Sequence, residues 1–168
     1  STFRSTWTRV ANGVPLPDFT YIVVQKRHRT RFYRRDVQVN NANPFPGTVI
    51  SEGAVSPHMF DFYMISHHTP EGTTRPAHYT VVVNESKFST DELTEMCFRL
   101  CCRYARCSKP VSIPSPVYYA HLRCKRAAIL FRRATRYTER VDKHAMTIEK
   151  KLNRDFTQPK KYPGMHFV

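Results

Sequence analysis

Acidic residues are scarce in this sequence. The chain of 168 residues has 13 Asp and Glu against 27 Lys and Arg, which leaves a formal net charge of +14 at pH 7. Such a field attracts polyanions, and nucleic acid is the most common of them. An anionic membrane surface or an acidic protein would satisfy the same field, so charge alone indicates a class of partner and no more.

The sequence also lacks the apolar segments of membrane and secreted proteins. No apolar run reaches the 18 residues of a membrane span. The first residues also lack the charged segment followed by an apolar segment that is typical of a signal peptide. Hydrophobic residues make up 40% of the chain and aromatic residues 12%, which excludes a disordered composition. We therefore expect a soluble, intracellular, globular protein with one core and no membrane partner.

The cysteines form no C-x-x-C pair. Their number is odd, and the spacing of three of them is helical, so we expect reduced core thiols in a cytosolic or nuclear compartment. A zinc site is the alternative, although the spacing fits none of the usual ligand patterns. The five cysteines are Cys97, Cys101, Cys102, Cys107 and Cys124.

Strand patterns dominate the first half of the chain. Residues 19–24 are rich in β-branched and aromatic side chains and lead directly into a run of cations at 25–35. Residues 59–66 and 78–84 also predict strands, and we expect these two to pair as antiparallel neighbours. The stretch 36–57 is rich in Asn, Pro and Gly, which predicts a surface loop.

The sequence after residue 88 has the pattern of a helix. Ser89 and Glu92 have the spacing of a capping box, in which each side chain satisfies an unpaired backbone N–H. One helix face is then marked by apolar residues at 93, 96, 97, 100, 101 and 104.

Ser115 and Pro116 have the order expected at the start of a second helix, which extends to residue 133. A weaker amphipathic pattern at 141–156 predicts a third. With strands early and helices late, the default is an α/β fold in which helices flank a mixed sheet. No internal repeat or low-complexity run suggests otherwise.

Three stretches together resemble the Argonaute family. They are YIVVQKRH at residues 21–28, the segments FDFY, SH and GTTRPAHY within 60–79, and SIPSPVYYAHL at 112–122. They occur in the family's order and at its spacing, which makes them far more specific together than singly. The third stretch is more similar to the Argonaute branch than to the Piwi branch.

The resemblance implies an RNase H-like (PIWI) fold, a mixed sheet flanked by helices, present here as a partial domain. Residues 1–168 would be the C-terminal part of a PIWI domain, with the resemblance clearest at 19–131. Residues 135–157 stay unassigned, and 159–168 form a C-terminal tail apolar enough to dock on a core. The absence of a starting Met agrees with a partial chain.

The resemblance also implies a role in RNA-mediated gene silencing. The full-length parent would be a guide-directed endoribonuclease that uses Mg²⁺ or Mn²⁺ held by acidic residues upstream of this region. In this chain the implied catalytic residue is His121, which is also a candidate metal ligand. Taken alone, a histidine on an apolar helix stripe is more often a core residue. No cofactor is expected for this chain by itself.

Guide binding is the second implied role. Arg126 would contact the guide's 5′-phosphate, for which a guanidinium fork is suited. The other matching positions would contact the guide backbone through phosphate oxygens, without reading sequence. The alternative for such charges is a solvated edge. The matching positions are Lys26, Arg27, His67, Arg75, Tyr104, Arg106, Ser112 and Tyr118.

Two further groups of residues invite a catalytic or metal role. Asp61 lies on a predicted strand, but it has no neighbouring carboxylate in the sequence, so we favour a structural role. His67, His68 and His78 match no known metal spacing, and contacts with phosphate or at the surface are the expectation.

The expected partners are single-stranded guide RNA, target RNA, the rest of the Argonaute chain and silencing cofactors. The expected location is the cytoplasm, and also the nucleus. Two other functions stay open. One is a non-slicing, guide-binding Argonaute that recruits partners, and the other is an unrelated basic RNA-binding protein such as a ribosomal component.

Overall fold

The computed structural model describes residues 5–7, 14–35 and 43–141, with side chains described as far as Arg132. The chain divides into two compact units, Ser1–Pro114 and Ser115–Val168, and each is described by itself. The labelled strands and the helix α2 belong to the first unit, and α3 belongs to the second.

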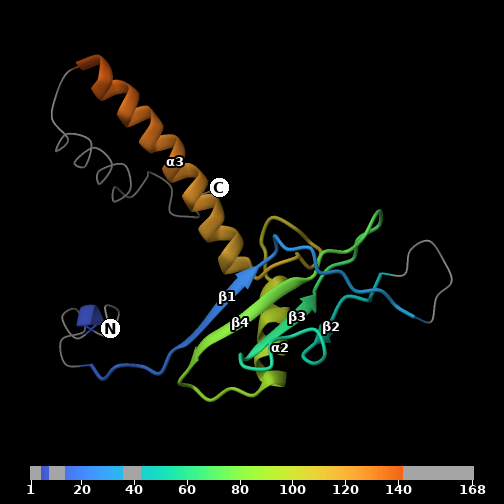
Figure 1. The fold of residues 1–168 in the computed structure, drawn as a ribbon. Helices are drawn as coiled ribbons and strands as arrows, with labels where there is room; N and C mark the ends of the chain where they lie inside the picture. Colours follow the sequence, from blue (N-terminus) through green and yellow to red (C-terminus); the bar gives the residue numbers. More distant parts are fainter. Residues whose placement is uncertain (1–4, 8–13, 36–42, 142–168) are drawn as a thin grey trace. The chain divides into compact units, whose positions relative to one another are not determined.

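A four-stranded sheet forms the first unit (Figure 1). The strands are β1 (Thr20–Gln25), β2 (Thr48–Ile50), β3 (Asp61–Ile65) and β4 (Ala77–Asn84). Their order across the sheet is β1-β4-β3-β2, and every neighbouring pair is antiparallel. The predicted pairing of the strands near 59–66 and 78–84 is confirmed. A mixed sheet was expected, but the described strands form no parallel pair.

Strand β2 contradicts part of the predicted surface loop at 36–57, whose other described residues form no helix or strand. Its residues Thr48–Ile50 pair with β3 at the edge of the sheet. The backbone N–H of Gly47 donates to the carbonyl of Ile65 at 2.7 Å, and Gly47 has a φ of +92°, which favours glycine. A segment of three residues among prolines and asparagines has no strand pattern of its own, because its extended form depends on the β3 backbone beside it.

Helix α2 (Thr90–Cys101) begins with the predicted capping box. The Glu92 N–H donates to Ser89 Oγ at 3.3 Å, and the Ser89 N–H donates to Glu92 Oε2 at 2.8 Å. The Ser89 N–H and the Ser89 hydroxyl, which also donates to Oε2, lower the pKa of the Glu92 carboxyl. The helix ends at Cys101, so the last position of the predicted stripe, Tyr104, lies beyond it.

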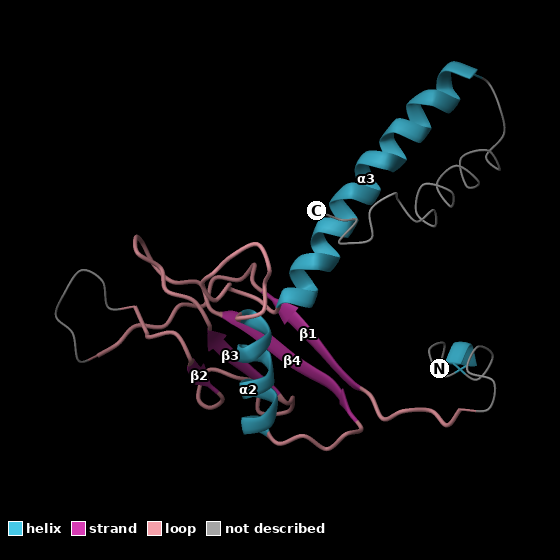
Figure 2. Ribbon diagram, turned by 180° about the vertical axis from the view of Figure 1, so that it is seen from behind, coloured by secondary structure: helices cyan, strands magenta, loops and turns pink. Residues whose placement is uncertain are grey.

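The core of the first unit lies between α2 and one face of the sheet (Figure 2). The rings of Phe62 and Tyr79 stack at 4.8 Å between centroids, and the Tyr79 hydroxyl lies 3.8 Å from Cys101 Sγ. Burial raises the pKa of Tyr79 and raises that of Cys97 to about 12. The core side chains are Phe62, Met64, Ala77, Tyr79, Val81, Leu93, Cys97 and Cys101.

All five cysteines are free, but they are not all core thiols as predicted. Cys97 and Cys101 are buried on the inner face of α2. Cys102, Cys107 and Cys124 are exposed, since the first two follow the last turn of α2 and the third lies on α3. Helical spacing alone therefore overestimated the number of cysteines that face the core.

Helix α3 extends over Ser115–Val141, which is longer than the predicted 116–133. Ser115 and Pro116 form its first turn, as expected. Apart from Val141, the predicted third pattern at 141–156 lies outside the described residues, and so does the tail at 159–168. None of the helices in the described part of the chain is long and apolar enough to cross a membrane.

Candidate nucleic-acid interface

One end of the sheet gathers residues from four separate segments. Strands β1 and β3 are each antiparallel to β4, so both end at the edge where β4 begins. Lys26 follows β1, His67 follows β3, and Arg75 precedes β4. Ser112 reaches the same place from the segment after α2. We call Lys26, His67, Arg75 and Ser112 the basic edge.

Lys26 is the centre of the basic edge. Its ammonium group donates to Ser112 Oγ at 2.5 Å. Burial lowers the pKa of Lys26, and the nearby guanidinium of Arg75 lowers it further. Among the described residues, no carboxylate forms an ion pair with Lys26, Arg27 or Arg75. A half-buried ammonium group among other cations and a hydroxyl is suited to an anion such as phosphate.

His67 adds a titratable group to this edge. Burial lowers the pKa of His67, and the charges of Lys26 and His68 lower it further. Its Nε2 lies 3.4 Å from Thr69 Oγ1, while its buried Nδ1 has no hydrogen-bond partner among the described residues. The neutral ring is therefore favoured in the free protein, and an anion nearby would favour the charged ring.

Ser112 is held in place by the core beneath it. Ser66 Oγ donates to the Val111 carbonyl at 2.6 Å, and the Val111 N–H donates to the Cys101 carbonyl at 3.0 Å. Ser112 itself is 5% exposed. These bonds join the end of β3 to the segment that follows α2, so the hydroxyl that accepts from Lys26 is fixed before any ligand arrives.

His28 links the segment after β1 to the segment before β4. It was not among the site residues predicted from the sequence. Its Nε2 lies 3.0 Å from the Pro76 carbonyl, directly after Arg75. Burial lowers the pKa of His28, which favours a neutral ring that donates through Nε2. The alternation of exposed and half-buried side chains continues from β1 through residue 28, so a period of two would have placed His28 on the side of Lys26.

Asp61, which is buried, and His78, which is partly exposed, form a hydrogen-bonded pair on the face of the sheet opposite α2. Asp61 Oδ2 lies 2.6 Å from His78 Nε2, and Asp61 Oδ1 accepts from the Ser56 N–H at 3.1 Å. Tyr63 lies opposite His78 in the β3–β4 register, and their rings stack at 4.3 Å. The structural role predicted for Asp61 is supported. The phosphate or surface contact expected of His78 stays a prediction, and it cannot use Nε2, which Asp61 occupies.

The remaining backbone-contact candidates of the first unit lie close in sequence to the basic edge. Arg27 is exposed and directly follows Lys26. Tyr104 and Arg106 lie in the segment that leads from α2 to Ser112, where the Cys107 N–H donates to the Tyr104 carbonyl at 3.1 Å. Tyr104 is half-buried and Arg106 is exposed.

Tyr118, His121 and Arg126 lie on α3, in the second unit. His121 is exposed, whereas Tyr118 and Arg126 are half-buried. Five residues separate His121 from Arg126, which puts them about 140° apart around the helix axis. The two side chains therefore point in different directions from the helix.

No group of three His, Cys, Asp or Glu side chains that could hold a metal ion occurs within the described part of the chain. His121 has no carboxylate set around it there. The residues present do not fit a two-metal site, and we derive no cleavage step from them.

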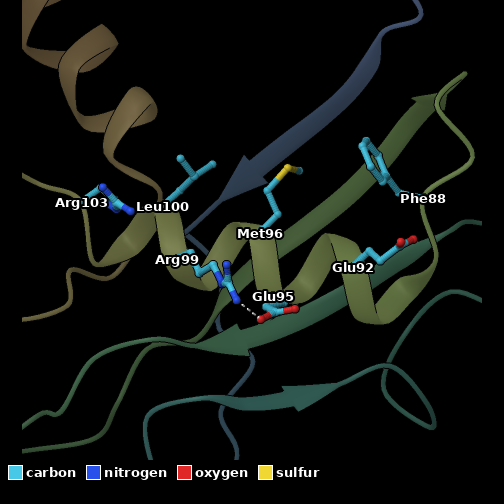
Figure 3. Close-up of a pocket in the computed structure, with 7 residues that line it drawn as sticks. All are labelled: Phe88, Glu92, Glu95, Met96, Arg99, Leu100 and Arg103. Atoms are coloured by element: carbon cyan, nitrogen blue, oxygen red, sulfur yellow. Dashed lines mark hydrogen bonds and ion pairs between the residues drawn. The ribbon is translucent and has the colours of Figure 1, made fainter.

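A concave surface lies along the outer face of α2 (Figure 3). It has a volume of about 600 Å³ and combines apolar side chains with both signs of charge. Arg99 and Glu95 form an ion pair at 2.5 Å across one helical turn. Because its charges are of both signs, this groove is less suited to a polyanion than the basic edge. It is lined by Phe88, Glu92, Glu95, Met96, Arg99, Leu100 and Arg103.

Comparison with known sequences identifies the family of this arrangement. Residues 1–132 match the family model described as Piwi domain. Protein argonaute 2 of Oryza sativa subsp. japonica is 43% identical over 118 residues, which cover 68% of this chain and 11% of that protein. Putative protein tag-76 of Caenorhabditis elegans is 48% identical over 114 residues, 66% of this chain and 11% of that protein. The chain thus spans little more than a tenth of these relatives.

Solved structures agree. The C-terminal lobe of a budding yeast Argonaute has a TM-score of 0.73 at 32% identity. The match covers 82% of this chain and 29% of the yeast chain. The Argonaute of Kluyveromyces polysporus with a guide RNA has a TM-score of 0.69 at 33% identity, over 78% of this chain and 16% of its own. Drosophila Piwi is 27% identical with a TM-score of 0.62, over 71% of this chain and 16% of its own. The predicted RNase H-like fold, as a partial domain of the Argonaute branch, is confirmed, and the chain belongs to the Piwi domain family.

Proposed function

We propose that this chain holds a small guide RNA by its backbone and acts in RNA-mediated gene silencing as part of a longer Argonaute. The observation that carries the proposal is the basic edge, where Lys26 is half-buried and bonded to Ser112 beside Arg75. The similar Argonaute of Kluyveromyces polysporus was solved with a guide RNA. Contacts to phosphate oxygens give affinity and register and leave the base sequence free.

The energetics favour an anion at this place. A buried ammonium group without a negative partner has lost part of its hydration and has gained little in return. A phosphate oxygen beside Lys26 would restore a charge-assisted hydrogen bond, and it would also reduce the repulsion between Lys26 and Arg75. The free protein therefore carries a cost at this site that RNA would relieve.

The roles of the α3 residues belong to the same proposal. We assign Arg126 to the guide's 5′-phosphate and Tyr118 to the guide backbone. His121 would contribute to slicing in the full-length protein, with Mg²⁺ or Mn²⁺ held by carboxylates outside this chain. The site of action would be the cytoplasm and also the nucleus, with target RNA and silencing cofactors as further partners. A non-slicing Argonaute that recruits partners is the alternative, and membership of the Piwi domain family excludes an unrelated basic protein.

RNA titration tests the proposal. Labelled single strands of the same length and different sequence should bind the 168-residue chain with similar affinity. The logarithm of the binding constant should fall with the logarithm of salt concentration by about 0.7 for each phosphate contacted. Affinity that does not change with salt, or strong preference for one sequence, would contradict backbone binding through these cations.

A second experiment separates the two sites of α3 in the full-length parent. His121→Ala should abolish slicing, if the parent slices, and leave guide affinity nearly unchanged. Arg126→Ala should weaken the binding of 5′-phosphorylated guides by about 1.5 to 3 kcal/mol, which is the contribution of a hydrogen bond between charged groups. The loss should be much smaller for guides that carry a 5′-hydroxyl. Equal losses for both guides would show that Arg126 adds only to the general positive field.

A further inference from the structure

Two exposed aromatic rings stand beside the segment that carries Lys26. Tyr33 is 63% exposed and Phe45 is 65% exposed. Arg34 brings their segments together, because its guanidinium carbon lies 4.2 Å above the centre of the Phe45 ring. We call Tyr33, Arg34 and Phe45 the aromatic arm. The arm shares no residue with the basic edge, and two of its three side chains are aromatic rings.

The exposed rings are carried by an anchored backbone. The neighbouring Phe32 ring packs edge-on against Tyr63 at 5.3 Å between centroids. Arg31 donates from Nη1 to the His28 carbonyl at 3.0 Å and to the Thr30 carbonyl at 2.7 Å. Phe32 and Tyr33 are adjacent in sequence but have opposite roles, since the first packs inward and the second faces solvent.

The Phe45 segment is anchored as well. Thr48 Oγ1 donates to the Phe45 carbonyl at 2.7 Å, and the Gly47 N–H donates to the Ile65 carbonyl at 2.7 Å at the start of β2. The exposed Phe45 ring therefore lies on a turn tied to the sheet. Rings that are held in solvent by a fixed backbone lose little further conformational entropy when a flat partner stacks on them.

The charge around the arm indicates what that flat partner is. Residues 26–35 contain six Lys and Arg and no carboxylate. Aromatic rings interleaved with cations bind single-stranded nucleic acid, since bases stack on the rings while phosphates meet the charges. A guanidinium stacked on a ring adds a second planar surface of the kind on which bases stack.

We propose that the aromatic arm is a base-stacking platform for single-stranded RNA, in addition to the backbone contacts of the basic edge. The proposal rests on the proposed function, since both concern the same RNA. It differs in the part of the RNA that is recognised: the edge binds phosphates and the arm binds the faces of bases. Stacking tolerates any base, so a platform of this kind is compatible with many guide or target sequences.

The test compares the 168-residue chain with its Tyr33→Leu/Phe45→Leu variant. Leucine keeps an apolar side chain and removes the flat ring. Each protein is titrated with an unmodified RNA strand and with a strand of equal length whose bases are replaced by abasic residues. The unmodified chain should bind the abasic strand about ten-fold more weakly than the strand with bases. A loss of this size is within the range expected for one base stacked on an aromatic ring. The variant should bind the unmodified strand about ten-fold more weakly, with the same salt dependence, and lose much less on removal of the bases.

Tyr21→Leu is the matched control, because Tyr21 is 57% exposed on β1 and lies outside the arm. It should behave like the unmodified chain with both strands. An equal abasic penalty in the variant and the unmodified chain would overturn the stacking platform and leave backbone binding intact. Failure of the unmodified chain to bind either strand would overturn the proposed function, and the platform with it.

Discussion

The basic edge and the outer groove of α2 both carry cations, yet they differ in how those cations are compensated. On α2, Arg99 pairs with Glu95, and the two side chains are 75% and 60% exposed. At the basic edge, Lys26 is half-buried, bonded to a serine hydroxyl and repelled by Arg75. A net charge of +14 predicts a polyanion but gives no location for it. The location follows from where positive charge is half-buried and has no carboxylate partner among the described residues.

The same comparison applies to two side-chain pairs of the first unit, Asp61–His78 and Arg99–Glu95. Asp61 and His78 lie on the sheet with side-chain exposures of 5% and 22%, whereas the Arg99–Glu95 pair is in water. Breaking a buried pair leaves a desolvated group behind, while breaking an exposed pair lets water replace the partner. The Asp61–His78 pair should therefore contribute clearly to the stability of the fold, and the Arg99–Glu95 pair should contribute little.

The largest expected effect is on stability. Asp61→Ala should lower the free energy of unfolding by about 2 to 3 kcal/mol, because His78 and the Ser56 N–H both lose their acceptor. Glu95→Ala should lower it by about 0.5 kcal/mol or less. Urea denaturation followed by circular dichroism measures both. Similar losses for the two variants would mean that burial does not separate these pairs.

A smaller effect concerns the pH dependence of RNA binding. The pKa of His67 is lowered in the free protein, and a bound phosphate would raise it. RNA binding should therefore take up a proton, and affinity should rise as pH falls through the bound-state pKa towards that of the free protein. The rise should reach up to about ten-fold for each unit by which RNA raises the pKa.

Titration at constant salt over the range in which the fold is intact measures this rise. The range has to be checked, because the lowered pKa values of His28 and His67 favour the neutral rings of the folded state. Their contribution to stability is present above the unfolded pKa and is lost as pH falls towards the folded pKa. His67→Gln should abolish the rise in affinity. If it persists in that variant, His67 is not the group that titrates.

A further small effect on stability belongs to the cap of α2. Ser89→Ala should lower the free energy of unfolding by about 1 kcal/mol, since the hydroxyl accepts from the Glu92 N–H. RNA affinity should stay unchanged, because α2 contributes to the fold and not to the anion site. A loss of affinity in the folded variant would bring α2 into the interface.

Local sequence patterns were sufficient to predict the cap of α2 and three of the four strands. The capping box at Ser89 and Glu92 depends on neighbours three residues apart, and the strands near β1, β3 and β4 carry their own apolar patterns. Strand β2 could not be predicted in this way, because Thr48–Ile50 is extended only through pairing with β3. Helix α3 continues past the predicted end at 133, through residues that no stop signal separates from it.

The site shows the same division. Resemblance to a family selected Lys26, His67, Arg75 and Ser112, and the strand directions explain why they meet. The pair of Asp61 and His78 depends on register: Tyr63 lies opposite His78, which makes Asp61 its diagonal neighbour on the same face. Register across a loop between two strands is not readable from spacing, so this pair emerged only with the structure.

The central claim is that RNA is bound where positive charge is half-buried and has no ion-pair partner among the described residues, and not by net charge alone. Two variants that each remove two positive charges test it most directly: Lys26→Gln/Arg75→Gln at the basic edge and Arg99→Gln/Arg103→Gln on α2. The measurement is the affinity for one RNA strand across a series of salt concentrations. The first variant should bind at least about ten-fold more weakly and lose about 1.4 from the salt slope, the value for two phosphate contacts to a single strand. The second should stay within about two-fold of the unmodified chain, as expected for groups that make no direct contact. Equal changes in the two variants would contradict the account, because they would show that RNA responds to the total charge and not to its arrangement.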